Sequence, residues 1–310
     1  MSTVPDTQHR FSTVSPEELE QIRRSYTRNS GRKLGDVLGR IWFWALIVAI
    51  LVYTLFPFYW AIVSSLTPEA DLFQTPVSLI PTSITFEHYR SVFESPSFML
   101  ALRNSAIVSI GVVILALFFG TLGAYALGRL KFRGRTIILY VILSMTMFPA
   151  IAILGSLFEV IRFLDLYNTW WGLIITYLTF TLPFTVWVLT NFFRALPGEL
   201  EEAALVDGAS PLKALWQILL PLAIPGLVTT GLLAFIAAWS EYLFALTFTI
   251  SDSARTVPVA IAQFTGNTQF ELPFAKRMAA AVVVTLPLIV LVMIVQRRII
   301  AGLTAGAVKG

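Results

Sequence analysis

The sequence predicts an all-α integral membrane protein with six membrane-crossing helices. Of its 310 residues, 56% are hydrophobic and only 13% are charged, and the mean hydropathy is +0.77. A soluble domain cannot bury so much apolar surface, so lipid must be the solvent for much of it. Six uncharged runs are long enough, or nearly so, to cross about 30 Å of hydrocarbon. These runs are residues 41–66, 104–128, 136–158, 168–193, 218–240 and 278–296.

The distribution of Lys and Arg predicts that both termini are cytoplasmic. Six spans place the two termini on one side, and 16 of the 22 Lys+Arg fall on that side. Positive charge concentrates on the cytoplasmic side of membrane proteins. Residues 1–40 hold seven of these cations, and Ser15 with Pro16 predicts the start of a short helix at the membrane surface. We therefore expect a cytoplasmic tail at 1–40, a transmembrane domain at 41–301 and a second cytoplasmic tail at 302–310.

Small residues and prolines inside the runs predict how the spans pack. Gly111, Gly120 and Gly123 recur along the second run, which favours close helix packing over a pore lining. Pro149 and Pro183 lie in the third and fourth runs and predict bends, which serve either packing or hinge motion. The first external loop, residues 67–103, holds four prolines and is expected to be irregular with short helices.

A charged segment at residues 197–217 separates the fourth and fifth runs. Three acidic residues open it, where the helix dipole favours negative charge. Gly208 then suits a left-handed helix end, and Ser210 with Pro211 suits the start of a second helix. The segment predicts a helix, a tight turn and a second helix. On these residues alone it is either an amphipathic helix resting on the membrane or a docking surface, with Ala203 and Ala204 allowing close approach.

The spacing within this segment resembles a known signature. Glu202-Ala203-Ala204, then Gly208, Ile218 and Leu220-Pro221, is similar to the EAA loop of ABC-importer permeases. The chain is most like the MalG-like subunit of maltose- and trehalose-type sugar importers, over about residues 40–310. The resemblance implies a type I ABC importer permease fold in a bacterial cell membrane. It also implies that this loop is the coupling helix that docks on a cytoplasmic ATPase, through Glu202, Ala203, Ala204, Asp207 and Gly208.

The resemblance extends to two further contact regions and to a set of partners. The C-terminal tail is similar to the family's ending, which implies contact with the ATPase through Gly302, Leu303, Thr304, Gly306 and Lys309. The third external loop corresponds to a loop that reaches the sugar-binding protein, here through Gln263, Phe264, Asn267 and Gln269. The implied partners are a second, MalF-like permease subunit, two ATPase subunits, an extracellular or periplasmic sugar-binding protein and the lipid bilayer.

Trp239, Glu241 and Tyr242 close the fifth run and are candidates for the substrate pathway. Glu241 lies about 34 Å beyond Ile218 along a helix, which places it near the outer surface. Aromatic rings stack on sugar faces, and a carboxylate accepts hydrogen bonds from sugar hydroxyls. An interfacial aromatic belt beside a solvated acid explains the same three residues equally well.

Missing motifs narrow the reaction class. The sequence has no P-loop, so we expect ATP and Mg²⁺ to bind the partner ATPase and no cofactor to bind this chain. It has no cysteine and two distant histidines, which predicts no metal site, and its basic residues are explained by membrane topology without nucleic acid. We expect no catalytic residue and a permease that imports a disaccharide of the trehalose or maltose type. The alternative is a non-transporting structural or assembly subunit of another membrane complex.

Overall fold

The structure is a computed structural model that describes residues 16–75, 78–81, 83–265 and 273–307. Side chains are described within these ranges at positions 17, 20 and 21 and from 37 to 296. Every regular element in the described residues is helical, which confirms the predicted all-α class. The chain divides into two compact units, residues 1–60 and 61–310.

The first unit is dominated by α1, which spans Pro16–Leu66 and continues six residues into the second unit. We expected a short surface helix that ends before a separate span at residue 41, but α1 is unbroken from Pro16. No proline lies between Pro16 and Pro57 to interrupt its hydrogen bonds. The stretch Val37–Leu66 is long and apolar enough to cross a membrane.

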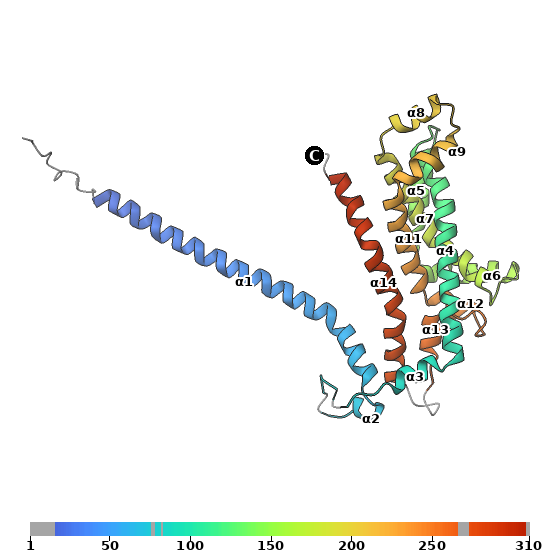
Figure 1. Cartoon of the computed structure of the whole chain (residues 1–310), viewed down its shortest axis with the longest axis horizontal. Coiled ribbons are helices and arrows are strands. Elements are labelled where there is room, and N and C mark those ends of the chain that lie inside the picture. Colours follow the sequence, from blue (N-terminus) through green and yellow to red (C-terminus); the bar gives the residue numbers. More distant parts are fainter. Residues whose placement is uncertain (1–15, 76–77, 82, 266–272, 308–310) are drawn as a thin grey trace, which may run out of the picture. The chain divides into compact units, whose positions relative to one another are not determined.

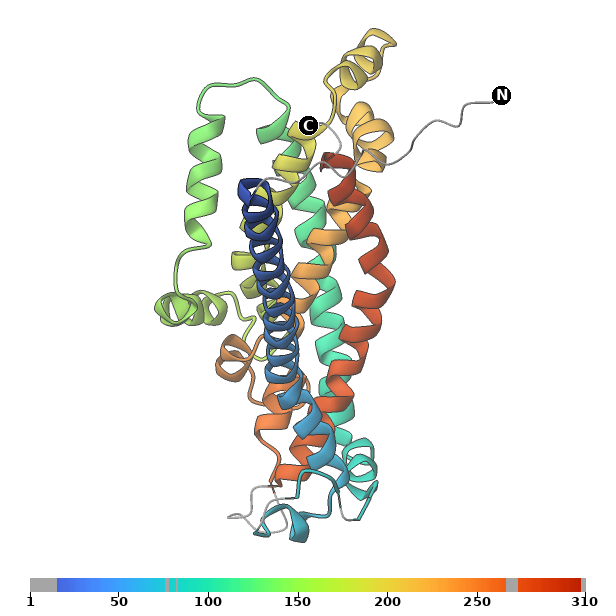
Figure 2. The same ribbon diagram turned by 90° about the vertical axis from the view of Figure 1, so that its left-hand side faces the viewer.

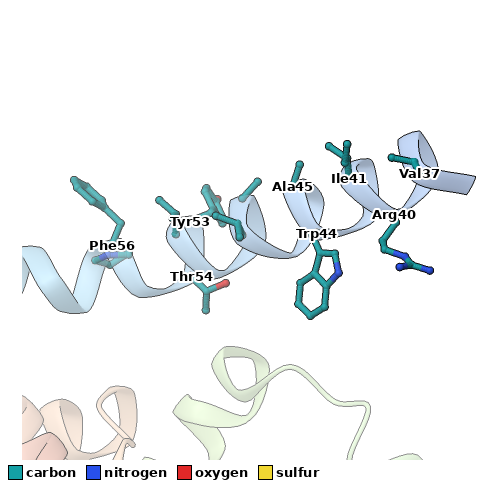
Figure 3. Close-up of a pocket in the computed structure, with 12 residues that line it drawn as sticks. Val37, Arg40, Ile41, Trp44, Ala45, Tyr53, Thr54 and Phe56 are labelled. Carbon is teal, nitrogen blue, oxygen red and sulfur yellow. The ribbon is translucent and has the colours of Figure 1, made fainter. Parts of the chain in front are cut away.

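The apolar side chains of α1 point away from the helix in several directions. Figure 3 shows Ile41 and Ala45 on one side and Trp44 on the other. Trp42 and Tyr53 are 74% and 85% exposed within the chain. A helix that is hydrophobic all round is suited to lipid or to a protein partner, and not to water. The lining residues drawn in Figure 3 all belong to α1, so this pocket is helix surface and not a closed cavity.

The second unit is a bundle built on four long helices. These are α4 (Pro96–Gly128), α7 (Trp170–Ala195), α11 (Ile224–Trp239) and α14 (Phe274–Ala307), and α4 packs against both α7 and α11 (Figure 2). Two short helices, α2 (Glu69–Leu72) and α3 (Glu87–Phe93), precede α4 and confirm the short helices expected in this loop, but α4 begins at Pro96, so the loop ends before the predicted residue 103. Ser95 begins α4 by accepting a hydrogen bond from the backbone N–H of Phe98.

The glycines of α4 form its packing seam with α7, as predicted. A Cβ added to Gly120 would lie 2.6 Å from Cγ2 of Thr185, and one added to Gly111 would lie 2.8 Å from Cδ1 of Ile174. Gly123 faces Val186 at ordinary contact distance. These glycines therefore bring the two helices together, and they do not line a pore.

Two of the six predicted spans are broken and not straight. The third consists of α5 (Arg135–Met145) and α6 (Ala150–Phe163), which meet at 96°. Pro149 has extended backbone before α6, so the helix stops and restarts there. Pro183, in contrast, lies inside the single helix α7. The described residues thus contain four helices able to span a membrane, or six if each bent pair is one span.

The fifth predicted span is broken between Leu222 and Ile224, where its two parts meet at 79°. The part before the break starts at Pro211, earlier than the predicted 218, and contains α9 (Pro211–Ala214), the π-helical turn η1 (Leu215–Leu219) and α10 (Leu220–Leu222). Pro221 has no backbone N–H to donate to Gln217, which interrupts the α-helical pattern at this point. In the second unit, α8 (Glu199–Val206) and α9 lie at one end and α3 at the other, and the last turns of α14 rise towards the α8–α9 end (Figure 1).

Candidate functional site

The segment α8–α9 has the helix–turn–helix form that its sequence predicts. Glu199, Glu201 and Glu202 lie in the first turn of α8, and Gly208 follows the helix with φ +82°. The N–H of Ala209 bonds to the carbonyl of Ala204 at 2.9 Å, and that of Gly208 to Leu205 at 3.1 Å. This pair of bonds is a Schellman motif, which requires a left-handed residue at its turn. A Cβ on Gly208 would meet no atom within 4 Å, so the backbone conformation, and not space, requires glycine here.

Ser210 starts the next helix immediately after this turn. Its hydroxyl accepts a hydrogen bond from the N–H of Lys213 at 3.3 Å, and Pro211 occupies the first helical position. The turn between α8 and α9 is therefore stabilised from both sides by local hydrogen bonds.

One face of this segment is open and partly apolar. Glu202, Ala203 and Asp207 are exposed, as a docking surface requires, whereas Ala204 is only 5% exposed and packs inward. Sequence reasoning did not single out the apolar residues that share the open side of the segment. They are Leu205, Val206 and Leu212, exposed by 44%, 87% and 57%. Large apolar side chains in a charged loop were the signal that could have identified them.

The opposite face of the segment is attached to the bundle. Glu201 accepts a hydrogen bond from the hydroxyl of Tyr125 on α4 at 2.7 Å, and its other carboxylate oxygen lies 3.6 Å from Nε of Arg129. Arg129 also donates to the carbonyl of Leu196 at 2.9 Å and more weakly to that of Pro197 at 3.3 Å. Sequence reasoning counted Arg129 only as a topogenic charge and gave Tyr125 no role.

A buried apolar cluster continues this attachment beneath α9 and η1. Leu215 and Leu219 of η1 are fully buried against Leu189 and Phe193 of α7 and Tyr125 of α4. The ring of Tyr125 meets that of Phe193 edge-on, with centroids 6.4 Å apart. The segment therefore has one exposed face and one face fixed to α4 and α7.

The three residues at the end of the fifth predicted span do not share one environment. Trp239 is 4% exposed and stacks on Phe235 with centroids 5.4 Å apart. Both carboxylate oxygens of Glu241 accept backbone N–H groups, from Phe244 at 2.8 Å and from Ala245 at 3.0 Å. These bonds stabilise the start of α12 (Leu243–Phe248). Tyr242 is 41% exposed and is the member of this set that is open to a ligand.

The expected binding-protein contact is only partly described. Gln263 is exposed at the end of α13 (Val257–Ala262). Phe264 packs against Phe98 at 5.8 Å between centroids and lies under the ammonium group of Lys276. Phe264 therefore anchors the loop, while Gln263 is free to face a partner. Asn267 and Gln269 lie outside the described residues.

The tail predicted at 302–310 has no structural boundary at its start. The helix α14 continues to Ala307, so the backbone of residues 302–307, which include Gly302, Leu303, Thr304 and Gly306, is helical. Helical geometry persists despite the two glycines, whose individual cost is only about 1 kcal/mol. Lys309 lies outside the described residues.

The range matched by a protein-family model includes most of the bundle and the segment α8–α9. The family described as binding-protein-dependent transport system inner membrane component matches residues 113–304, from the middle of α4 through most of α14. The chain belongs to this family. Membership, with the apolar helices described above, makes it a multi-pass membrane component of a transport system.

Two curated members of the family are similar along nearly their whole length. The trehalose transport system permease protein SugB of Mycobacterium tuberculosis is 44% identical over 272 residues, which are 87% of this chain and 98% of that protein. The trehalose/maltose transport system permease protein MalG of Thermococcus litoralis is 41% identical over 89% of this chain and 99% of that protein. The predicted MalG-like resemblance is therefore confirmed.

Two chains of solved structures support the fold. One chain of a bacterial ABC transporter involved in the import of the acidic polysaccharide alginate matches with a TM-score of 0.73 and 26% identity, covering 86% of this chain and 97% of that chain. A chain of the alginate transporter in complex with an alginate pentasaccharide-bound periplasmic protein matches with a TM-score of 0.63 at 14% identity, which shows the fold alone. The predicted ABC importer permease fold is thereby confirmed.

Proposed function

We propose that this chain is the MalG-like permease subunit of an ATP-driven importer for a disaccharide of the trehalose or maltose type. The observation that carries the proposal is the two-faced segment α8–η1, which has an open, partly apolar face and a face fixed to α4 and α7. A loop that only rested on lipid would not need the Tyr125–Glu201 contact. The substrate class rests on the names of the relatives SugB and MalG.

In this proposal ATP hydrolysis occurs on partner subunits. The sequence contains no Gly-x-x-x-x-Gly-Lys-Ser/Thr, so ATP and Mg²⁺ are assigned to two ATPase subunits and no cofactor or metal to this chain. Each ATPase subunit docks on the coupling helix of one permease, here through Glu202, Ala203, Asp207 and the exposed apolar residues beside them. The C-terminal residues 302–310 make a second contact with the ATPase.

The remaining partners complete the pathway. A second, MalF-like permease covers the apolar surfaces that this chain leaves open, and a sugar-binding protein delivers substrate at the opposite end. Gln263 and the neighbouring loop face that protein, and Tyr242 is the proposed substrate-pathway residue with an accessible side chain. Both termini are cytoplasmic, on the side of α8 and α9, because most Lys and Arg of the loops lie there.

Mechanically, closure of the ATPase dimer moves α8 and α9 as one body. The Schellman turn at Gly208 and the cap at Ser210 make the segment stiff enough to act in this way. The bends at residues 146–149 and at Ala223 divide two spans into parts that reorient relative to each other. The substrate pathway thereby changes from opening towards the cytoplasm to opening towards the outside.

Expression of the tagged chain with the other genes of its transporter tests the proposal. An ATPase and a second permease should co-purify with the chain, and vesicles should take up labelled trehalose or maltose only with ATP and binding protein. Purification without an ATPase, or sugar uptake that is unchanged in cells lacking this chain, would instead support a structural or assembly subunit.

A further inference from the structure

Among the acidic residues of α8, Glu201 is the one whose side chain contacts the helical bundle, at Tyr125 and Arg129. Its side chain is 15% exposed, and that of Arg129 is 11% exposed. The hydroxyl of Tyr125 donates to one carboxylate oxygen at 2.7 Å, and Nε of Arg129 lies 3.6 Å from the other. Charges so shielded from water are retained only where partners compensate for their lost hydration. Glu202, one residue later and about 100° around the helix, is exposed.

Arg129 connects three elements at this point. It follows α4 directly, its Nε faces Glu201 of α8, and its Nη2 donates to the carbonyls of Leu196 and Pro197 at the end of α7. The guanidinium of Arg129 therefore connects the end of α4 to the backbone of Leu196 and Pro197, which joins α7 to α8. Its planar group of donors suits it to contacts in several directions at once.

Tyr125 carries the same connection into the bundle. The residue is 4% exposed, and its ring packs on Phe193 and on the cluster that buries Leu215 and Leu219 of η1. Both halves of the coupling segment, α8 through Glu201 and η1 through its leucines, thus contact one tyrosine on α4. Along the residues of α4 that precede Tyr125, the glycines pack closely against α7, so we expect the two helices to move together.

We propose that Tyr125, Arg129 and Glu201 form a joint through which displacement of α8 is passed to α4, with Glu201 as its positioning residue. This inference rests on the proposed function. In this proposal the two neighbouring acids of α8 have different roles: Glu202 faces the ATPase and Glu201 faces the bundle. Loss of the joint leaves the ATPase attached but lets α8 move without carrying α4 with it.

The complete transporter tests this proposal with three variants. Tyr125→Phe removes only the hydroxyl, Glu201→Gln removes only the charge, and Glu199→Gln is the control, since Glu199 is an exposed acid of the same turn. Attachment of the ATPase, stimulated ATP hydrolysis and vesicle uptake are measured for each. For the two joint variants we expect normal attachment and about a tenfold rise in ATP hydrolysed per sugar imported, as loss of a charge-assisted hydrogen bond allows. Glu199→Gln should match the wild type.

The double variant separates a shared contact from two independent defects. If Tyr125 and Glu201 act through one contact, Tyr125→Phe combined with Glu201→Gln should be no worse than the stronger single change. Normal coupling in both single variants, additive losses in the double variant, or detachment of the ATPase in either single variant would overturn the joint. A wild-type complex that binds no ATPase or imports no sugar would reject the proposed function instead.

Discussion

Two glutamates, Glu201 on α8 and Glu241 between α11 and α12, show how differently one side chain acts in this chain. Glu201 reaches across 76 positions to Tyr125 on another helix, whereas Glu241 accepts the backbone N–H groups of Phe244 and Ala245, three and four positions away. The first contact joins two helices that are far apart in the sequence, and the second stabilises the start of a short helix beside it. The difference teaches that the charge of a residue does not reveal its function until its hydrogen-bond partners are known.

The largest effect is expected where the geometry of the coupling segment depends on one residue. Gly208→Val places a β-branched side chain at φ +82°, at a cost of about 1–2 kcal/mol or more. The turn then opens and α8 tilts away from its partner. We expect normal membrane insertion with loss of sugar uptake and of substrate-stimulated ATPase activity. Gly198→Ala is the matched control, because Gly198 has φ −68° and open space around it. Full uptake by Gly208→Val would remove the basis of the coupling assignment.

A smaller effect is expected from the exposed acid beside Glu201. Glu202→Ala removes a carboxylate that would become buried and hydrogen-bonded on docking, so attachment of the ATPase should weaken by about tenfold or more. Glu17→Ala removes an exposed acid on α1 and should change nothing comparable. Quantitative co-purification of the ATPase with each variant measures the difference. Equal yields would favour a coupling segment that merely lies on the membrane.

The smallest effect is expected at Glu241, the second glutamate of the comparison. Glu241→Ala removes the hydrogen bonds at the start of α12 and should lower stability by about 0.5–2 kcal/mol, which thermal unfolding of the purified chain would detect. Tyr242→Ala leaves those bonds intact and should slow sugar uptake without lowering the unfolding temperature. If Glu241→Ala instead slows uptake at unchanged stability, Glu241 belongs to the substrate pathway after all.

Local signals in the sequence were sufficient for the coupling segment itself. Gly208 and Ser210 act through hydrogen bonds to residues at most four positions away, so their roles could be predicted without a fold. The glycines of α4 were equally informative, since small residues at helical spacing have few uses in a membrane helix.

The remaining features depend on neighbours that no local signal specifies. Pro149 separates two helices whereas Pro183 lies inside one, although both are prolines in apolar runs. Likewise, Glu201 and Glu202 are adjacent acids, and only the position of Tyr125 beside α8 decides which of them faces inward. The engaged carboxylate of Glu241 was unforeseen because α12 is too short to be recognised as a helix from its pattern.

Site-directed crosslinking tests the central claim most directly, because the chain contains no native cysteine. Val206→Cys places a single thiol on the coupling segment at a position that is 87% exposed, and Ile250→Cys places one at a 64% exposed position beyond α12. Reaction of the assembled transporter with a short thiol-to-amine crosslinker should join the chain to its ATPase through Val206→Cys and not through Ile250→Cys. An ATPase adduct from Ile250→Cys alone, or from neither variant in a complex that retains the ATPase, would contradict docking at α8–η1.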